Sequence, residues 1–153
     1  EDITMKQYNF VHSITTASNA LLGLVNDILD LSKIEAKKLK LAPSTMDMNS
    51  TCDELEVIFA QRAMKKGIDF QIMIPVDIPS LIIDGLRLRQ ILSNLIDNAV
   101  KFTEKGHVHL IISHYPSEKK HQINLQFVVR DTGIGISPER VKYVFNAFIF
   151  SIC

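Results

Sequence analysis

The stretch DGLRLRQILSNLIDNAVKFT, residues 84–103, decides the fold, because its residues repeat with the period of a helix. Asp84 opens the predicted helix, which runs to about Phe102. At about 100° per residue, an apolar set falls on one side and is expected to pack on a sheet: Ile91, Phe102, Leu95, Leu88, Ala99 and Leu92. A polar set falls within a narrow arc on the opposite side: Arg87, Gln90, Asn94, Asn98 and Lys101.

Two asparagines of this polar set, Asn94 and Asn98, are candidate ligand-binding residues. The simpler interpretation is a solvated helix face. Asparagine has a below-average helix propensity, however, so two of them one turn apart are poor choices for such a face. An amide oxygen suits Mg²⁺, which usually keeps several waters and shares phosphate oxygens. Lys101, close to one turn further on, could reach a phosphate.

A short strand and a helix are expected before this stretch. Thr45–Met48 is a candidate strand. Asn49 or Ser50 could cap a helix that runs to about Lys66 and ends at Gly67.

The remaining elements are mostly strands. Ile68–Ile74 alternates apolar and polar residues as a strand does, and Val108–Tyr115 with Ile123–Arg130 predicts a hairpin. Ser137 is the expected cap of a last helix, with Pro138 at its first position. This order of elements predicts an α+β fold, a mixed sheet with helices on one face.

Residues 3–41 predict one long amphipathic helix. Gly23 is its only helix breaker, and the first proline of the chain is Pro43. The apolar residues follow heptad spacing: Ile3, Phe10, Ile14, Ala17, Leu21, Leu24, Ile28 and Leu31. A second set widens this stripe as in a helix bundle: Val11, Leu22, Val25 and Leu29. Such a helix needs a partner helix, from its own chain or another, so we expect self-association. Pro43 and Ser44 mark the joint to the rest of the chain.

Composition excludes several classes of protein. Seventeen Lys and Arg balance seventeen Asp and Glu, which argues against a protein that coats nucleic acid. No apolar run reaches the length of about 20 residues that crosses a bilayer, and the N-terminus has no signal segment. Cys52 and Cys153 are far apart and have no metal-ligand spacing. A cytoplasmic protein is therefore expected, with no nucleic acid partner and no membrane contact from this segment.

The turn Asp131-Thr132-Gly133-Ile134-Gly135-Ile136 is a second candidate site. Aspartate and glycine are common in turns for local reasons alone. The segment is neither a dinucleotide-binding fingerprint nor a P-loop. In its functional interpretation, the Asp131 carboxylate accepts a hydrogen bond from an adenine amino group, and the glycines let the backbone approach the base.

Taken together, these segments resemble the core of sensor histidine kinases of two-component systems. RLRQILSNLIDNAVKFT at 87–103 is similar to that family's asparagine box, and VRDTGIGI at Val129–Ile136 to its first glycine box. VFNAF at Val144–Phe148 resembles the phenylalanine box. LVNDILDLSKIEAKKLKL at Leu24–Leu41 resembles the end of the second helix of the dimerisation hairpin. Several independent motifs agree in order and spacing.

The resemblance implies a fold, a ligand and a reaction. Residues 1–42 would be the second helix of the dimerisation hairpin, and residues 43–153 a truncated ATP-binding catalytic domain, the α/β sandwich shared with gyrase, Hsp90 and MutL. The parent would transfer the ATP γ-phosphate to a histidine and then to an aspartate of a response-regulator receiver domain.

The resemblance also implies site residues. Asn98 would coordinate Mg²⁺ with Asn94 beside it, and Lys101 would contact phosphate. Asp131 would bind the adenine amino group, with Gly133 and Gly135 shaping the pocket.

Three departures from the family pattern predict that this chain alone is inactive. The phosphoacceptor sequence is absent, and His12, in the context FVHSI, is expected to be an ordinary helix histidine. The second glycine box is also absent. The last residues, Ile149–Cys153, abandon the pattern abruptly, as a premature stop, a frameshift or a truncation would produce. No catalytic residue is therefore assigned.

Two other functions remain open from the sequence. One is a non-catalytic dimerisation or docking module derived from a histidine kinase. The other is an ATPase of the gyrase, Hsp90 or MutL type. Those families place a catalytic Glu four residues before the metal-binding Asn, where this chain has Asn94, which argues against a general base there.

Overall fold

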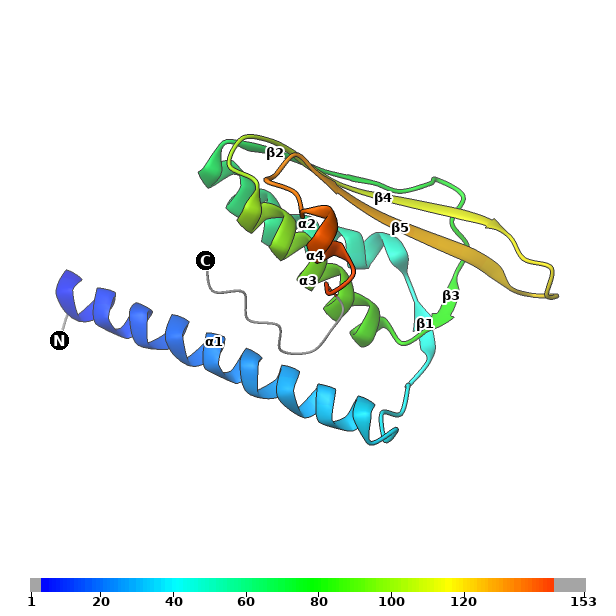
Figure 1. Cartoon of the computed structure of the whole chain (residues 1–153), viewed down its shortest axis with the longest axis horizontal. Helices are drawn as coiled ribbons and strands as arrows, with labels where there is room; N and C mark the ends of the chain where they lie inside the picture. Colours follow the sequence, from blue (N-terminus) through cyan, green and yellow to red (C-terminus); the bar gives the residue numbers. More distant parts are fainter. Residues whose placement is uncertain (1–3, 145–153) are drawn as a thin grey trace. The chain divides into compact units, whose positions relative to one another are not determined.

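The computed structural model describes residues 4–144, which divide into two compact units (Figure 1). The first unit extends to Leu41 and the second begins at Ala42. The phenylalanine box, from residue 145 on, and the segment Ile149–Cys153 lie outside the described residues. Within residues 4–144, no helix is both long and apolar enough to cross a membrane.

The first unit is one long helix, α1 (Met5–Glu35). Thr4 caps its start: the Thr4 hydroxyl accepts from the Gln7 amide, while the Gln7 side chain accepts from the Thr4 amide. The predicted apolar stripe is largely exposed, with 53–65% of the surface of Phe10, Ile14, Leu21, Leu24 and Ile28 accessible. The helix therefore has no partner for this stripe among the described residues of its own unit.

The predicted end of this helix was wrong. The helix stops at Glu35 rather than near Leu41, because Lys37 adopts a left-handed conformation with φ 56°. The amides of Lys38 and Leu39 then fold back onto the Lys33 carbonyl, at 2.8 and 3.2 Å. Glycine usually fills such a position. Because this position is occupied by a lysine, the sequence contains no recognisable signal for the end of the helix.

The second unit contains two sheets. Strands β1 (Ser44–Met46) and β3 (Leu81–Ile83) form a small antiparallel pair. The larger sheet has the order β2-β4-β5, from Ile68–Met73, Gly106–Pro116 and Ile123–Asp131. Strand β2 is parallel to β4, and β4 is antiparallel to β5. The sheet is therefore mixed, and β4 with β5 forms the predicted hairpin.

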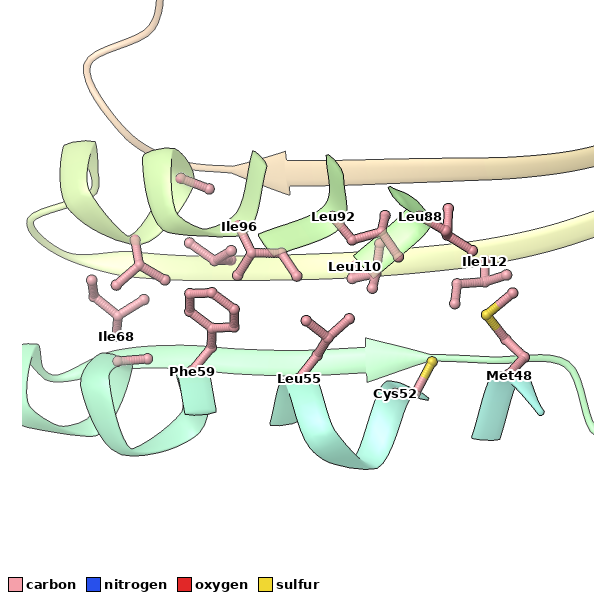
Figure 2. Close-up of a cluster of buried hydrophobic side chains, with 14 of the residues drawn as sticks. Met48, Cys52, Leu55, Phe59, Ile68, Leu88, Leu92, Ile96, Leu110 and Ile112 are labelled. Carbon is pink, nitrogen blue, oxygen red and sulfur yellow. The ribbon is translucent and has the colours of Figure 1, made fainter. Parts of the chain in front are cut away.

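Helices α2 (Met48–Lys66) and α3 (Gly85–Phe102) contact the larger sheet and each other (Figure 1). Their apolar side chains point toward one another, and β4 adds Leu110 and Ile112 (Figure 2). Ion pairs at 2.5 Å join the two helices, Arg62 to Asp97 and Glu54 to Arg89. This arrangement confirms the predicted α+β fold.

The apolar face of α3 differs from the prediction. Its buried residues are Leu88, Leu92, Ile96, Ala99 and Val100. Ile91, Leu95 and Phe102, which were expected on the sheet, are 44–56% exposed. The buried face is rotated because α3 packs against α2 as well as against the sheet. The three exposed side chains lie between the buried face and the asparagines.

Smaller corrections concern element ends. Helix α2 is capped by Asp47, whose carboxylate accepts from the Asn49 amide at 3.1 Å, and not by Asn49 or Ser50. Strand β3 was not predicted from the sequence. Gly67 ends α2 with φ 69°, as expected. The short helix α4 (Pro138–Val141) follows Ser137, with Pro138 in its first turn.

Candidate functional site

The start of α3 is fixed by Asp84. One carboxylate oxygen accepts from the Arg87 amide at 3.1 Å, and the other accepts from the Ala42 amide at 2.9 Å. The bond from Ala42, together with that from Arg87, lowers the pKa of Asp84 below its usual value. Asp84 thus both caps α3 and ties the helix to the segment before β1.

Asn94, Asn98 and Lys101 are all exposed on α3. The two amides lie one turn apart, and the Lys101 ammonium lies 5.1 Å from the centre of the Phe102 ring. Their exposure agrees with a ligand-facing or a solvated surface, and both alternatives were predicted from the sequence.

The Asp131 turn begins where β5 ends. One Asp131 carboxylate oxygen accepts from the Gly133 amide at 2.9 Å, so the side chain is oriented by its own turn. Thr132 anchors the turn to the start of β4: its amide donates to the His107 carbonyl at 3.2 Å, and its hydroxyl accepts from the His107 amide at 3.0 Å. The Asp131 side chain remains exposed.

The turn also docks on the last turn of α3. The Ile134 amide donates to the Phe102 carbonyl at 3.3 Å. A Cβ on Gly133 would lie 2.6 Å from that carbonyl oxygen, so the approach requires glycine. Gly135 has φ 68°, a conformation that also favours glycine. The structure therefore places the Asp131 turn directly beside the helix that carries the asparagines.

A hollow of about 290 Å³ opens at this junction. It is lined by Phe102, Glu104, Lys105, Thr132, Gly133 and Ile134. Ile134 is 81% exposed, and Phe102 is half exposed. Apolar side chains thus line the hollow together with Gly133, whose amide binds the Asp131 carboxylate, an arrangement that suits a flat ligand with one polar edge.

The two predicted site segments thus meet at the last turn of α3, and two residues at this junction were missed. Asn94 and Asn98 lie two turns and one turn before Phe102, at about 1.5 Å per residue along the helix. Thr132 and Phe102 were not singled out from the sequence. A signal for Thr132 existed, because a hydroxyl beside a turn commonly bonds to nearby backbone. For Phe102 the helical period pointed to the core instead.

Comparison with known proteins identifies the class. Residues 83–150 match the model of the histidine kinase-, DNA gyrase B- and HSP90-like ATPase family. The match covers the helix with the asparagines and the Asp131 turn together. Residues 83–150 thus belong to this ATPase family, and nearly the whole chain is similar to sensor histidine kinases.

Named relatives support this placement. The chain is 39% identical over 149 residues to the signal transduction histidine-protein kinase BarA of Escherichia coli K12, covering 96% of this chain and 16% of BarA. It is 37% identical to hybrid signal transduction histidine kinase L of Dictyostelium discoideum, covering 95% of this chain and 8% of the relative. The chain therefore spans less than a fifth of these relatives.

Solved structures agree on the fold. The structure of full-length ShkA in complex with AMPPNP has a TM-score of 0.73 and 32% identity, covering 92% of this chain and 29% of that chain. Acinetobacter baumannii histidine kinase AdeS has a TM-score of 0.72 at 21% identity, covering 94% of this chain and 68% of that chain, a likeness that shows the fold alone.

Proposed function

We propose that the second unit binds ATP and serves as the nucleotide-binding domain of a sensor histidine kinase. The observation that carries this proposal is the docking of the Asp131 turn on the last turn of α3. This contact joins the turn that carries Asp131 to the helix that carries Asn94, Asn98 and Lys101. The ShkA neighbour was solved with the ATP analogue AMPPNP.

Each site residue has a proposed role. The Asp131 carboxylate accepts from the adenine amino group, while Gly133 and Gly135 let the base lie against the backbone. Lys101 pairs with a phosphate. Asn98 offers an amide oxygen to Mg²⁺, with Asn94 beside it.

The residues present fit a magnesium ion that the nucleotide brings with it. Among the described residues, no group of three or more His, Cys, Asp or Glu could hold a metal ion. Asn98 is exposed and contributes one oxygen, so phosphate oxygens and water would complete the shell. The bound ion would neutralise phosphate charge.

The parent protein is proposed to transfer the ATP γ-phosphate to a histidine and then to an aspartate of a receiver domain. A response regulator is the corresponding partner. ThkA, which shares the fold at 21% identity and a TM-score of 0.59, was solved in complex with response regulator TrrA. A cytoplasmic location of this segment stays a prediction.

This chain alone is proposed to be inactive as a kinase. His12 lies on α1 beside Tyr8, with ring centroids 6.3 Å apart. His109 and His114 bond to carboxylates, Asp69 at 3.1 Å and Asp77 at 3.3 Å. Incubation with labelled ATP should leave the chain unlabelled, because its sequence lacks the family's phosphoacceptor sequence and second glycine box. Acid-labile label on any histidine would contradict this proposal.

The nucleotide proposal is tested by titrating ADP with and without Mg²⁺, followed by NMR chemical shifts. We expect shifts at Gly133, Ile134 and Asn98. Asn98→Ala should remove most of the Mg²⁺ dependence, whereas Asn26→Ala, an exposed asparagine on α1, should not. Shifts confined to residues outside this surface would contradict the assignment and favour a non-catalytic module.

A further inference from the structure

The end of α3 is the place where the two parts of the proposed nucleotide site meet. A helix leaves its last four carbonyls without partners inside the helix. In α3 the Thr103 amide closes the last intrahelical bond, to the Ala99 carbonyl at 3.0 Å. The carbonyls of residues 100–103 must therefore find partners elsewhere.

Lys66 supplies partners for three of these carbonyls. Its ammonium donates to the carbonyls of Val100 at 2.7 Å, Lys101 at 2.9 Å and Thr103 at 3.1 Å. An ammonium has three protons, so this group uses its full donor capacity on one helix end. A cation at a helix C-terminus is also favoured by the helix dipole.

Lys66 reaches this position from another element. It is the last residue of α2, and the chain turns away immediately after it through the left-handed Gly67. Arg62, one turn earlier, pairs with Asp97 of α3. The end of α2 is thereby held against the end of α3, with the Lys66 ammonium over the open carbonyls.

The fourth carbonyl, that of Phe102, accepts from the Ile134 amide of the Asp131 turn. The four terminal carbonyls of α3 are thus shared between one lysine and one turn. Their positions are coupled, because they belong to consecutive peptide groups. A shift of the carbonyls at 100, 101 and 103 would move the Phe102 carbonyl on which Gly133 and Ile134 dock.

We propose that Lys66 is a positioning residue for the adenine pocket: it holds the end of α3 so that the Asp131 turn presents its carboxylate to the base. This inference rests on the proposed function and adds a residue outside the surface that would touch nucleotide. Lys66 is exposed to solvent overall, so water competes for the carbonyls and the effect on binding is moderate.

A different explanation would make Lys66 a general positive charge near the phosphates. Lys66 lines a hollow of about 350 Å³ together with Arg62, Lys65 and Lys101. Adenosine separates the two explanations, because it has the base and no phosphate. A positioning role weakens adenosine and ADP alike, while a charge effect weakens only ADP.

The test compares three variants of the whole chain, titrated with adenosine and with ADP by NMR. Lys66→Met keeps the apolar stem and removes the donors; we expect threefold to tenfold weaker binding of both ligands. Lys65→Met removes the same charge from the neighbouring position, and affinity should stay within twofold of wild type. Lys66→Arg retains donors at this position and should recover part of the loss.

A general loss of stability is controlled by Ile68→Val, which removes one buried methyl group from β2. If Ile68→Val lowers the melting temperature as much as Lys66→Met does, it should still leave the affinity for adenosine unchanged. Equal weakening in Ile68→Val and Lys66→Met would overturn the inference, as would weakening of ADP alone in Lys66→Met.

Amide hydrogen exchange tests the positioning step without any ligand. The Ile134 amide should exchange at least fivefold faster in Lys66→Met than in wild type, with Lys65→Met unchanged. Unchanged Ile134 exchange in Lys66→Met would refute the positioning role itself. A wild-type chain that binds no adenosine would overturn the proposed function, and with it the link to adenine, while the exchange result would still stand.

Discussion

Helices α1 and α3 are both amphipathic, yet their apolar residues end in different environments. On α1 the large heptad residues are more than half exposed: Phe10, Ile14, Leu21, Leu24 and Ile28. On α3 five residues are buried against α2 and the sheet: Leu88, Leu92, Ile96, Ala99 and Val100. A periodic apolar pattern therefore indicates that a helix needs a packing partner, but it does not indicate whether the described residues include that partner.

The largest expected effect concerns the missing partner of α1. Leu24→Lys combined with Ile28→Lys should convert a self-associated chain to monomers, because the exposed apolar stripe is the surface that pairing would bury. Val76→Lys, at a fully exposed apolar residue of the second unit, is the control. Sedimentation at tens of micromolar, about the range expected for moderate helix pairing, gives the answer. A wild-type chain that is already monomeric would contradict this prediction.

The next effect sharpens the same contrast within α3. Ile96 is fully buried, whereas Ile91, five residues earlier, is 56% exposed. Ile96→Ala should lower the free energy of unfolding by about 2–5 kcal/mol through transfer and cavity costs. Ile91→Ala should change it by less than about 1 kcal/mol. Denaturant unfolding measures both, and equal losses would show that the buried face of α3 is assigned wrongly.

These helices also show what the sequence could predict. The extent of α3, the hairpin β4–β5 and the end of α2 at Gly67 follow from period, alternation and a glycine stop. The rotation of the buried face of α3 could not be predicted, because it depends on packing against α2, which is distant in sequence. The end of α1 at Glu35 could not be predicted either, because it depends on Lys37 adopting a left-handed backbone conformation.

The sequence predicted the polar residues of the candidate site, but it did not predict the contacts that hold the site together. Asn98 and Asp131 stand out by residue type and motif. The docking of the Ile134 amide on the Phe102 carbonyl, and the reach of Lys66 to three carbonyls, join segments some 30 residues apart. No local pattern encodes such contacts, because they exist only once both elements are packed.

A smaller effect contrasts two glycines. A Cβ on Gly133 would meet the Phe102 carbonyl oxygen at 2.6 Å, whereas a Cβ on Gly23 of α1 meets nothing within 4 Å. Gly133→Ala should therefore destabilise the second unit by about 1–3 kcal/mol. Gly23→Ala should raise the helix content of α1, since alanine is favoured by about 1 kcal/mol in a helix. Thermal unfolding and circular dichroism measure these changes, and a neutral Gly133→Ala would contradict the close approach.

The smallest effect concerns Cys52 in the core of the second unit. Burial, with Asp53, Glu56 and Asp47 adding to it, raises the pKa of the Cys52 thiol to about 11. The neutral thiol favours the folded state, so its contribution is fully present below the unfolded pKa of about 8.5 and is lost as pH rises through about 11.

In a Cys153→Ser chain, where Cys52 is the remaining thiol, reaction with a thiol reagent at pH 8 should be slow until the protein unfolds. Fast reaction of the folded protein would show that Cys52 is accessible.

The central claim is that the Asp131 turn, docked on α3, binds adenine. The direct measurement is calorimetric or NMR titration of wild type, Asp131→Ala and Asp131→Asn with ATP and GTP. Wild type should bind ATP and not GTP, because the guanine O6 would face the carboxylate as acceptor against acceptor. Asp131→Ala should lose this preference. Asp131→Asn, which can still accept from the Gly133 amide while presenting a donor, should shift it toward GTP. Equal binding of ATP and GTP by wild type, unchanged in both variants, would contradict the account.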